Sequence, residues 1–366
     1  MKYSEMPELV IGDIVAKKPI VQGGMGIGVS LSRLASAVAN EGGIGVISSV
    51  GMSFLDKDTK KRSKDANIIA IREEIRKARK LTDGILGINI MLALTEFDEI
   101  LKASFEEGID IVFMGAGLPL KLPKEITPEL LKTSKTKTAV IVSSDRAAKI
   151  IFQNWAKYFN HVPDAVVVEG PLAGGHLGFK NENIDSPDYS LEKIFPGVVE
   201  AVKPFEESFS KKIPVLAAGG IFSGEDIHKY IDMGASGVQM ATRFVATDEC
   251  DASDDFKNSY INSKQEDIII IKSPVGMPGR AIRNTFLDEV EAGRKKPFYC
   301  PWKCLKTCNF KESLYCIAQA LVSAQKGILA DGFAFAGANA YKISEIVSVK
   351  KLFTLLENEY SQYKPA

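Results

Sequence analysis

Short runs of apolar residues recur along the chain, and each run is followed by a longer segment whose apolar positions repeat with helical spacing. Eight such units occur, with runs at residues 19–22, 45–48, 86–90, 111–114, 139–142, 165–168, 214–217 and 237–240. The runs are continuously apolar rather than alternating, which is typical of strands buried on both faces. The pattern therefore predicts parallel β-strands connected by helices.

Polar residues mark several of the predicted helix starts. Ser30–Ser32 precede the first helix, Ser144 precedes the helix after the fifth strand, and Ser223 precedes the helix after the seventh. A serine at this position accepts a hydrogen bond from a free backbone N–H, which fixes the order strand, loop, helix. Eight units ending near residue 245 predict an α/β fold of the (β/α)8 TIM barrel type, with a doubly wound open sheet as the alternative.

Two segments fall outside the eight units. Residues 51–65 are rich in Lys and Asp and form an insertion after the second run, which is either a solvated loop or a lid over the site. Residues 251–366 follow the last unit. We therefore predict a barrel over residues 1–250 and a mainly helical C-terminal region over residues 251–366 that packs on it.

With 366 residues, of which 45% are apolar and 25% charged, the chain has the composition of a globular protein with a large core. Lys and Arg together number 46, as do Asp and Glu, so no net charge draws the chain to nucleic acid or to an anionic membrane. Residues 1–13 are interrupted by acidic side chains, unlike a secretory signal, and no apolar run is long enough to span a bilayer. We expect a cytoplasmic protein whose partner is a small-molecule substrate.

Glycine is concentrated where barrels gather their functional groups, at the C-terminal ends of the strands. Consecutive glycines let backbone N–H groups approach an anion closely, and the start of a following helix adds partial positive charge. The loops after the seventh and eighth runs therefore predict a phosphate site, with a tight turn as the simpler alternative. Their candidate residues are Ala218, Gly219, Gly220, Gln239, Met240, Ala241 and Thr242.

The loop after the first run is also rich in glycine, but its spacing does not match the dinucleotide-binding pattern. We interpret Gly24, Met25 and Gly26 as a backbone segment that lies against a flat ring. Asn89 is a polar residue in the otherwise apolar third run. It is placed to bind the edge of such a ring, or it is a hydrogen-bonded core residue.

The three histidines differ in their surroundings. His161 follows a helix end and His228 lies within a helix, so we expect both at the surface. His176 follows the sixth run, directly after Gly174–Gly175, where its side chain is free to enter a cavity. Imidazole exchanges protons near neutral pH, so His176 is the predicted acid/base residue. Glu169, at the strand end, is a candidate to orient His176 or to contact a cofactor.

Residues 7–290 resemble the nitronate monooxygenase family, formerly called 2-nitropropane dioxygenases, and the related flavin-type enoyl-acyl-carrier-protein reductases. The motifs that carry the resemblance are Pro19-Ile20-Val21-Gln22-Gly23-Gly24-Met25, Gly87-Ile88-Asn89, Ala173-Gly174-Gly175-His176-Leu177-Gly178, Ala217-Ala218-Gly219-Gly220-Ile221 and Gln239-Met240-Ala241-Thr242-Arg243-Phe244. The resemblance implies a TIM barrel that holds FMN. It places the phosphate at Gly219, Gly220 and Gln239–Thr242, the isoalloxazine near Gly24, Met25 and Asn89, and His176 in the active site.

The sequence departs from the family pattern at two places. Relatives often carry a flavin-contacting Gln in a Pro-Gln-Val context, where this chain has Pro196-Gly197-Val198. Ala241 stands where a glycine is common in the phosphate loop, which restricts backbone approach there.

The resemblance leaves two activities open. The first is oxidation of alkyl nitronates by molecular oxygen, in which His176 would act as a base toward neutral nitroalkanes. The second is NAD(P)H-dependent reduction of an enoyl thioester, in which His176 would supply a proton. We favour nitronate oxidation, because the insertion at residues 51–65 and the long C-terminal region are not expected in a compact reductase. A protein that binds FMN only as a sensor is a third hypothesis.

Four of the five cysteines, Cys300, Cys304, Cys308 and Cys316, lie close together with the spacing C-x3-C-x3-C-x7-C. On a helix, the first three would lie along one stripe. Thiolates arranged in this way would ligate an iron–sulfur cluster or zinc, although the spacing is not a standard one for either. The simpler interpretation, in which small thiols pack the C-terminal region and no metal is bound, is the one the sequence favours.

Overall fold

The computed structural model describes residues 5–56, 63–294, 300 and 303–363. One sheet contains eight parallel strands, in the order β3-β11-β10-β8-β7-β6-β5-β4. Backbone hydrogen bonds of 2.9 Å join Gln22 N to Ile44 O and Ile44 N to Ile20 O, and they close the sheet between β3 and β4. The predicted TIM barrel is thus confirmed. Its strands are β3 (Ile20–Gln22), β4 (Gly45–Ser48), β5 (Leu86–Met91), β6 (Ile111–Gly115), β7 (Lys137–Val142), β8 (Ala165–Glu169), β10 (Val215–Ala218) and β11 (Gly237–Met240).

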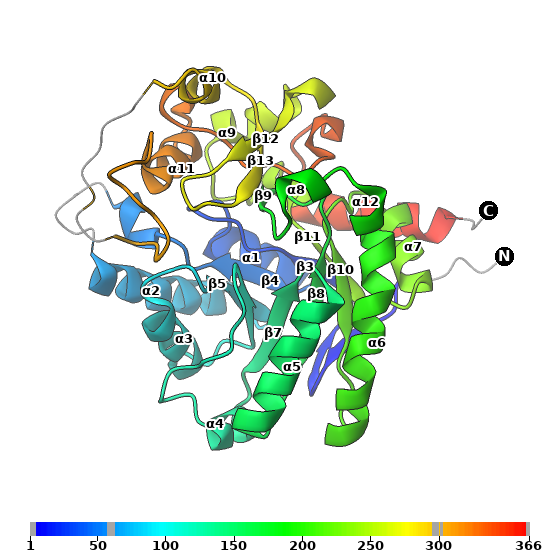
Figure 1. Cartoon of the computed structure of the whole chain (residues 1–366). Helices are drawn as coiled ribbons and strands as arrows, with labels where there is room; N and C mark the ends of the chain where they lie inside the picture. Colours follow the sequence, from blue (N-terminus) through cyan, green and yellow to red (C-terminus); the bar gives the residue numbers. More distant parts are fainter. Residues whose placement is uncertain (1–4, 57–62, 295–299, 301–302, 364–366) are drawn as a thin grey trace.

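Helices surround this barrel and cover the outer faces of the strands (Figure 1). They are α1 (Ser32–Asn40), α2 (Lys64–Leu81), α3 (Phe97–Glu106), α4 (Pro128–Thr133), α5 (Asp145–Phe159), α6 (Leu191–Phe209) and α7 (Gly224–Asp232). The side chains of Ser144 and Ser223 cap α5 and α7 as predicted. At the start of α1 the cap is instead Asp251, whose carboxylate accepts a hydrogen bond of 2.8 Å from Leu31 N.

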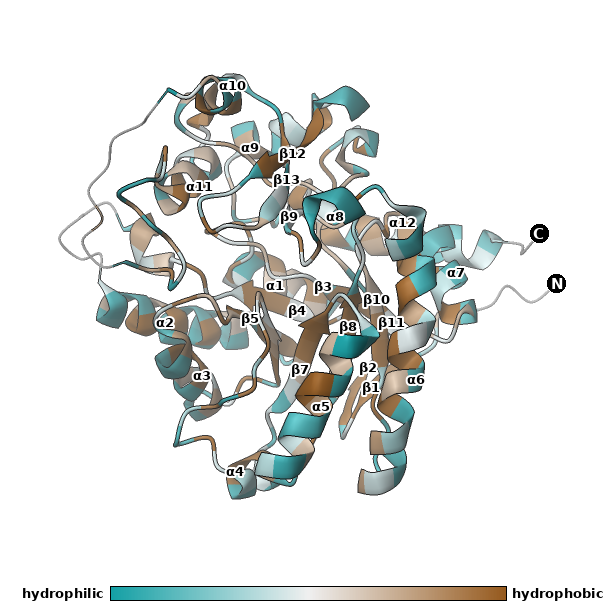
Figure 2. Ribbon diagram, in the orientation of Figure 1, coloured by the Kyte–Doolittle hydropathy of each residue, from teal (hydrophilic) through white to brown (hydrophobic). Residues whose placement is uncertain are grey.

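The strands are apolar along their length, whereas the helices have one apolar and one polar side (Figure 2). Side chains that point into the barrel form an inner core, which includes Val21, Val46, Phe113, Val167 and Leu216. The hairpin of β1 (Leu9–Ile11) and β2 (Ile14–Ala16) packs three of its buried side chains against this core. The opposite side of each strand packs on the helices, which explains why the runs are continuously apolar.

The barrel is completed by the last helix of the chain. After β11, α8 (Thr242–Val245) is only four residues long. The helix that packs against both α7 and α1, the place of an eighth barrel helix, is α12 (Val349–Gln362). Residues 246–348 are therefore inserted between the eighth strand and this helix. The division of the chain at residue 250 stays a prediction.

Two histidines expected at the surface are largely buried. His228 lies under α12, where its ring stacks on Tyr360 with 4.4 Å between the ring centroids. His161 has its Nε2 atom buried without a hydrogen-bond partner among the described residues. Burial first, and then the nearby charge of Lys211, lower the pKa of His161 to about 4. Both histidines therefore belong to packing between elements.

The inserted region lies over the C-terminal ends of the barrel strands (Figure 1). It contains α9 (Asp254–Ile261), α10 (Thr285–Glu291) and α11 (Ile317–Gln325), together with a hairpin that the sequence analysis did not predict. The hairpin strands, β12 (Ile268–Lys272) and β13 (Pro278–Ile282), form an antiparallel sheet with β9 (Gly175–His176). Among the described helices, none combines the length and apolar composition that crossing a membrane requires.

The insertion after the second strand is short in its described part. Residues 52–55 form one turn of 3-10 helix. Ser63 caps α2, so the end of the predicted insertion belongs to that barrel helix. Residues 57–62 of the predicted insertion lie outside the described residues.

Candidate functional site

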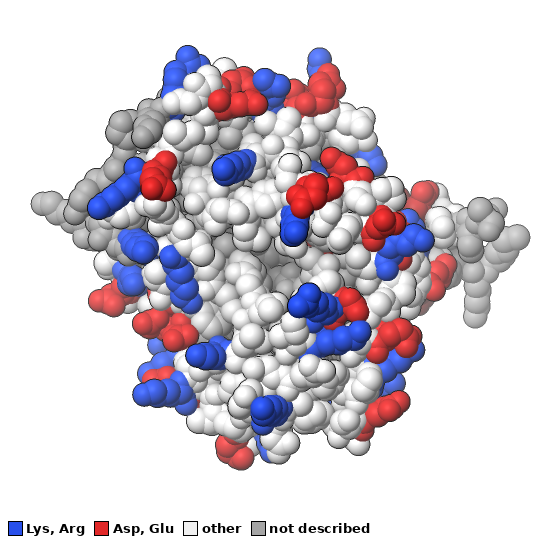
Figure 3. Space-filling view, in the orientation of Figure 1, with Lys and Arg blue, Asp and Glu red and all other residues white. Residues whose placement is uncertain are grey.

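A cavity of about 520 Å³ opens at the C-terminal ends of the barrel strands, beneath the inserted region. Charged residues of both signs are interspersed on the face in Figure 3, around a hollow with few charges. The residues proposed from the sequence that line the cavity are Gly24, Met25, Gly26, Asn89, Glu169, Gly174, Gly175, His176, Gln239, Ala241 and Thr242. Ala218, Gly219, Gly220 and Met240 are not among its lining residues.

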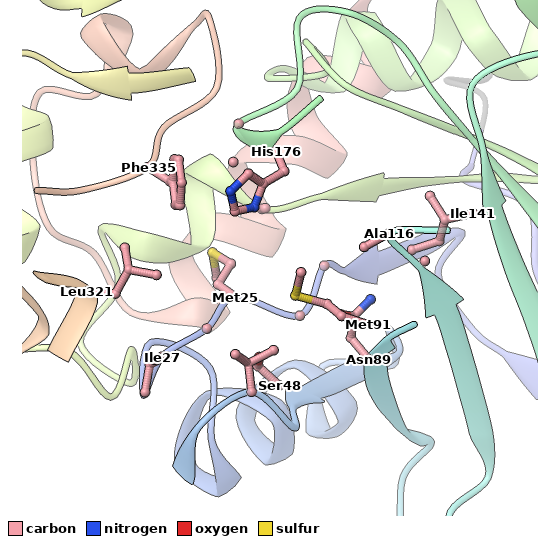
Figure 4. A pocket seen from close by; sticks show the side chains of 18 of the residues that line it. Met25, Ile27, Ser48, Asn89, Met91, Ala116, Ile141, His176, Leu321 and Phe335 are labelled. Atoms are coloured by element: carbon pink, nitrogen blue, oxygen red, sulfur yellow. The ribbon is translucent and has the colours of Figure 1, made fainter. Parts of the chain in front are cut away.

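One wall of the cavity is formed by the first loop and the third strand. A Cβ atom at Gly24 would lie only 2.5 Å from Asn89 Cβ, so only glycine lets the loop pass this close to β5. Ser48 Oγ is buried and has no hydrogen-bond partner among the described residues. Met91 lies beside Asn89 in Figure 4, and Met25 lines the same cavity. This wall offers soft apolar surface beside polar groups, which fits a flat heteroaromatic ring with hydrogen-bonding edges.

His176 is positioned by the hairpin from the inserted region. Its strand, β9, pairs with β13, and His176 Nε2 lies 2.7 Å from Ser273 Oγ in the turn between β12 and β13. The ring of Phe335 meets the imidazole edge-on, with centroids 5.0 Å apart. Burial lowers the pKa of His176 to about 4, so the imidazole is neutral at pH 7.

The same burial shifts the pKa of Glu169 upward, opposite to the shift of His176. It ends β8 and lines the cavity, and burial raises its pKa to about 7. Burial disfavours the charged form of either group, so the cavity contains a neutral imidazole and a partly protonated carboxyl at neutral pH. No Lys or Arg is among the described residues that line the cavity. An anion would therefore be held by backbone N–H groups and neutral side chains.

Arg280 on β13 fixes the loop that carries His176. Its side chain is 5% exposed, and Nη1 donates hydrogen bonds to Pro171 O and to Ala173 O, the latter at 2.8 Å. This contact is a second connection between the loop after β8 and the inserted hairpin. Because the loop is held at both places, the imidazole has a defined position in the cavity.

The two predicted phosphate loops are covered by the segment Ala336–Asn339. Gly337 N donates to Thr242 Oγ1 at 3.1 Å, and Asn339 Nδ2 donates to Gly220 O at 2.6 Å. Gly219 has a φ of 90°, and a Cβ there would lie 2.7 Å from Gly170 O, so this glycine serves the packing of two loops. The role of these loops in phosphate binding stays a prediction.

Ser273, Phe335 and Arg280 were not among the candidates from the sequence. All three come from the inserted region, and Ser273 is 97 positions from His176. The small and aromatic composition of residues 332–341 was a weak indication that this segment covers the site. No pattern in the sequence indicated which hydroxyl would meet the imidazole.

The structure does not place Cys304 and Cys308 on a helix. Between residues 303 and 316 the described chain contains no helix, because the next helix, α11, begins at Ile317. Across the described part of the chain, no three His, Cys, Asp or Glu side chains converge in a way that would hold a metal ion. Cys304 nevertheless lines the cavity.

A model of the nitronate monooxygenase family matches residues 8–359. The chain belongs to the nitronate monooxygenase family. One relative is a probable nitronate monooxygenase of Staphylococcus aureus, which is 27% identical to this chain over 307 residues. The match covers 74% of this chain and 77% of the relative.

Another relative of this chain is a Mycobacterium tuberculosis enzyme, (3aS,4S,5R,7aS)-5-hydroxy-7a-methyl-1-oxo-octahydro-1H-indene-4-carboxyl-CoA dehydrogenase. The two are 29% identical over 277 residues, which is 76% of this chain and 66% of the relative. The corresponding enzyme of Rhodococcus jostii is 28% identical, over 75% of this chain and 65% of the relative. The chain thus spans about two thirds of the length of these two relatives.

Solved structures of similar fold include both kinds of enzyme. FabK from Thermotoga maritima is 28% identical and superposes with a TM-score of 0.72, covering 95% of this family member and 94% of FabK. A nitroalkane oxidase from Streptomyces ansochromogenes is similar in fold, with a TM-score of 0.71 at 22% identity, over 94% and 96% of the two chains. Because FabK covers nearly the whole chain, the insertion and C-terminal region do not argue against a reductase, and that expectation was wrong.

Proposed function

We propose that this protein uses FMN to oxidise alkyl nitronates with molecular oxygen, and that it also accepts neutral nitroalkanes. The match to the nitronate monooxygenase family supports the nitronate part of the proposal. The observation that carries the nitroalkane part is the neutral, buried imidazole of His176, held by Ser273 beside the cavity. A base must be unprotonated to remove a proton, and a histidine with a pKa of about 4 is unprotonated throughout the neutral range.

The residues present fit FMN at the wall formed by the first loop. Gly24, Met25 and Asn89 would hold the isoalloxazine, since the glycine leaves room for close approach and Ser48 Oγ is a buried polar atom without a partner. Gln239, Ala241 and Thr242 would face the phosphate. When bound, FMN supplies the two-electron oxidation that amino-acid side chains do not provide.

His176 supplies the proton chemistry of the proposal. When Nε2 donates its hydrogen to Ser273 Oγ, the lone pair of the imidazole is on Nδ1, which makes no hydrogen bond to a described residue. Nδ1 is then the atom that takes the α-proton of a neutral nitroalkane. A nitronate has already lost this proton, so its oxidation does not depend on the base.

The apolar side of the cavity suits the alkyl part of such a substrate. Phe335, Leu321 and Ile27 line it on the side away from Asn89 (Figure 4). These side chains would exclude water around the reacting carbon.

A second function has one specific observation in its favour, the superposition with FabK over 95% of this chain. Reduction of an enoyl thioester requires a group that donates a proton to the substrate carbon. An imidazole with a pKa of about 4 carries no extra proton at neutral pH, so His176 would have to be protonated before it could donate to the substrate carbon, whereas its lone pair is free to accept a proton. This difference is why we place nitronate oxidation first.

The test uses the FMN-loaded protein in an oxygen electrode. We expect rapid oxygen consumption with propyl-2-nitronate and with fresh neutral 2-nitropropane, without added NADH or NADPH. In parallel, NADH and NADPH are added under argon with a crotonyl thioester. Fast nicotinamide oxidation coupled to thioester reduction, with slow nitronate turnover, would overturn the proposal in favour of the reductase. Slow turnover of both substrates at full FMN occupancy would support the sensor.

A further inference from the structure

The first loop, which covers residues 23–31, is closed on itself by Ser30. Met25 N donates a hydrogen bond of 2.7 Å to Ser30 Oγ, and Ser30 N donates one of 3.0 Å to Met25 O. Ser30 is buried, and its carbonyl oxygen accepts a hydrogen bond of 3.0 Å from Ser48 N on β4. Both backbone polar groups of Met25 are thus bonded to Ser30. The place of Met25 in the cavity wall therefore depends on how the chain enters α1 just after Ser30.

The start of α1 is held by a residue from the inserted region. Leu31, at the N-cap position, has no side-chain oxygen for the free N–H groups of the first turn. Asp251, 220 positions away, supplies it, because its Oδ2 atom accepts hydrogen bonds of 2.8 Å from Leu31 N and 3.3 Å from Leu34 N. Glu74 on α2 adds one further contact, of 3.1 Å, from Ser32 N. Asp251 is therefore the main acceptor at this helix start.

The inserted region also holds the carbonyl groups of the first loop. Asp251 N donates a hydrogen bond of 3.1 Å to Val29 O. Gln325 on α11 donates from Nε2 to Gly28 O at 3.2 Å and to Asp251 O at 3.0 Å. Two successive carbonyls of the loop and the helix start that follows are thus fixed together, around Asp251.

We infer that Asp251 is a positioning residue for the cofactor, which sets the affinity for FMN by holding the first loop in the shape that receives the isoalloxazine. Asp251 is not among the described residues that line the cavity, so it acts through the loop. A loop that already has its bound shape loses less conformational freedom when the ligand binds, which increases affinity. The inference rests on the FMN site proposed above, and it adds a role in cofactor binding for the inserted region.

The experiment measures the dissociation constant of FMN for the full chain, freed of flavin, by the quenching of flavin fluorescence. In Asp251→Ala, the N–H groups of Leu31 and Leu34 lose their shared acceptor, so we expect the dissociation constant to rise about tenfold. Gln325→Ala, which removes the donor to Gly28 O, should raise it about fivefold. Burial raises the pKa of Asp251 to about 6, so the titration is made at about pH 8, where the carboxyl is ionised.

Two further variants separate positioning from charge and from stability. Asp251→Asn keeps a side-chain oxygen that accepts both hydrogen bonds, so its dissociation constant should stay within about threefold of the wild-type value. Ser253→Ala is the matched control, because Ser253 Oγ caps α9 by accepting a hydrogen bond of 3.3 Å from Phe256 N. This variant removes a helix cap from the same region and leaves the contacts to the first loop in place, so its affinity for FMN should be unchanged.

Hydrogen exchange of the flavin-free proteins is the second measurement. We expect the amide hydrogens of residues 25–34 to exchange faster in Asp251→Ala than in the wild type, and those of α7 to exchange at the same rate in both. FMN binding by Asp251→Ala as tight as that of the wild type would overturn the inference, and so would an equal loss of affinity in Ser253→Ala. Wild-type protein that does not bind FMN would overturn the inference together with the proposed cofactor. Because no substrate is present, slow nitronate turnover counts against the proposed function alone.

Discussion

His176 is a side chain whose chemistry is set by what surrounds it rather than by its own type. An exposed histidine has a pKa near 6.5, whereas burial lowers the pKa of His176 to about 4. As pH falls, an exposed base would be lost below about pH 6.5, but His176 stays neutral until the pH approaches 4. We therefore expect His176 to cause no loss of the wild-type rate with neutral 2-nitropropane between about pH 5.5 and 8, so that a change in rate near pH 7 would report the titration of Glu169 in the same cavity.

Replacing the base separates proton removal from the rest of the reaction. In His176→Gln, we expect oxidation of neutral 2-nitropropane to fall about 10²-fold or more, because the general base is lost. Oxidation of the preformed nitronate should fall less than about 10-fold, since that substrate needs no base. Initial rates of oxygen consumption with the two substrates measure the split. Equal losses on both would mean that His176 binds substrate and takes no proton.

Ser273→Ala is the companion variant, because Ser273 acts through His176. It removes the partner of Nε2 and leaves the imidazole in place. Loss of one hydrogen bond of about 1 kcal/mol should lower the neutral nitroalkane rate about fivefold and spare the nitronate rate. A change in stability alone would lower both rates together, so the ratio distinguishes positioning from folding.

At the scale of elements, α12 is the last helix of the chain, yet it packs as part of the barrel, so we expect its buried face to contribute to the stability of the barrel. Leu356 is 0% exposed where α12 packs into the barrel between α7 and α1. Leu356→Ala should lower the free energy of unfolding by about 2–5 kcal/mol. Thr354→Ala, on the exposed side of the same helix, should change it by less than about 0.5 kcal/mol. Urea unfolding measures both, and a cost below about 1 kcal/mol for Leu356→Ala would mean that α12 is peripheral.

The sequence predicts elements well where local pattern decides them, and poorly where distant segments meet. All eight strands were predicted because each is an apolar run that the barrel buries on both faces. The pairing of β13 with β9 was not, because it joins residues about a hundred positions apart. For the same reason His176 was found from its own loop, whereas Ser273 required the structure. Whether α12 or α8 completes the barrel likewise depends on packing between distant helices.

At the scale of the whole molecule, the inserted region and the barrel share one core. The largest cluster of buried side chains includes barrel residues such as Trp155 and residues of the inserted region such as Phe286 and Phe333. A shared core makes two parts unfold together, since neither buries its apolar surface alone. The inserted region is therefore part of the barrel's stability as well as a cover for its cavity.

Removing one buried side chain of the inserted region should therefore destabilise the barrel as well. Phe333 is 0% exposed and lies 5.0 Å from Phe335, measured between ring centroids. Phe333→Ala should lower the free energy of unfolding by about 3–5 kcal/mol. The fluorescence of Trp155, 0% exposed on α5, reports barrel unfolding when Trp302 is replaced by Phe in every variant.

We expect the urea midpoint of the Trp155 signal to move to lower concentration in Phe333→Ala, in a single transition. The control is Ile328→Ala, which removes a side chain that is 50% exposed in the same region and should leave the midpoint nearly unchanged. If the inserted region unfolded as a separate domain, the Trp155 midpoint would stay where it is, and far-ultraviolet circular dichroism would show a second, earlier transition. A single shifted transition would mean that the elements covering His176 unfold cooperatively with the barrel.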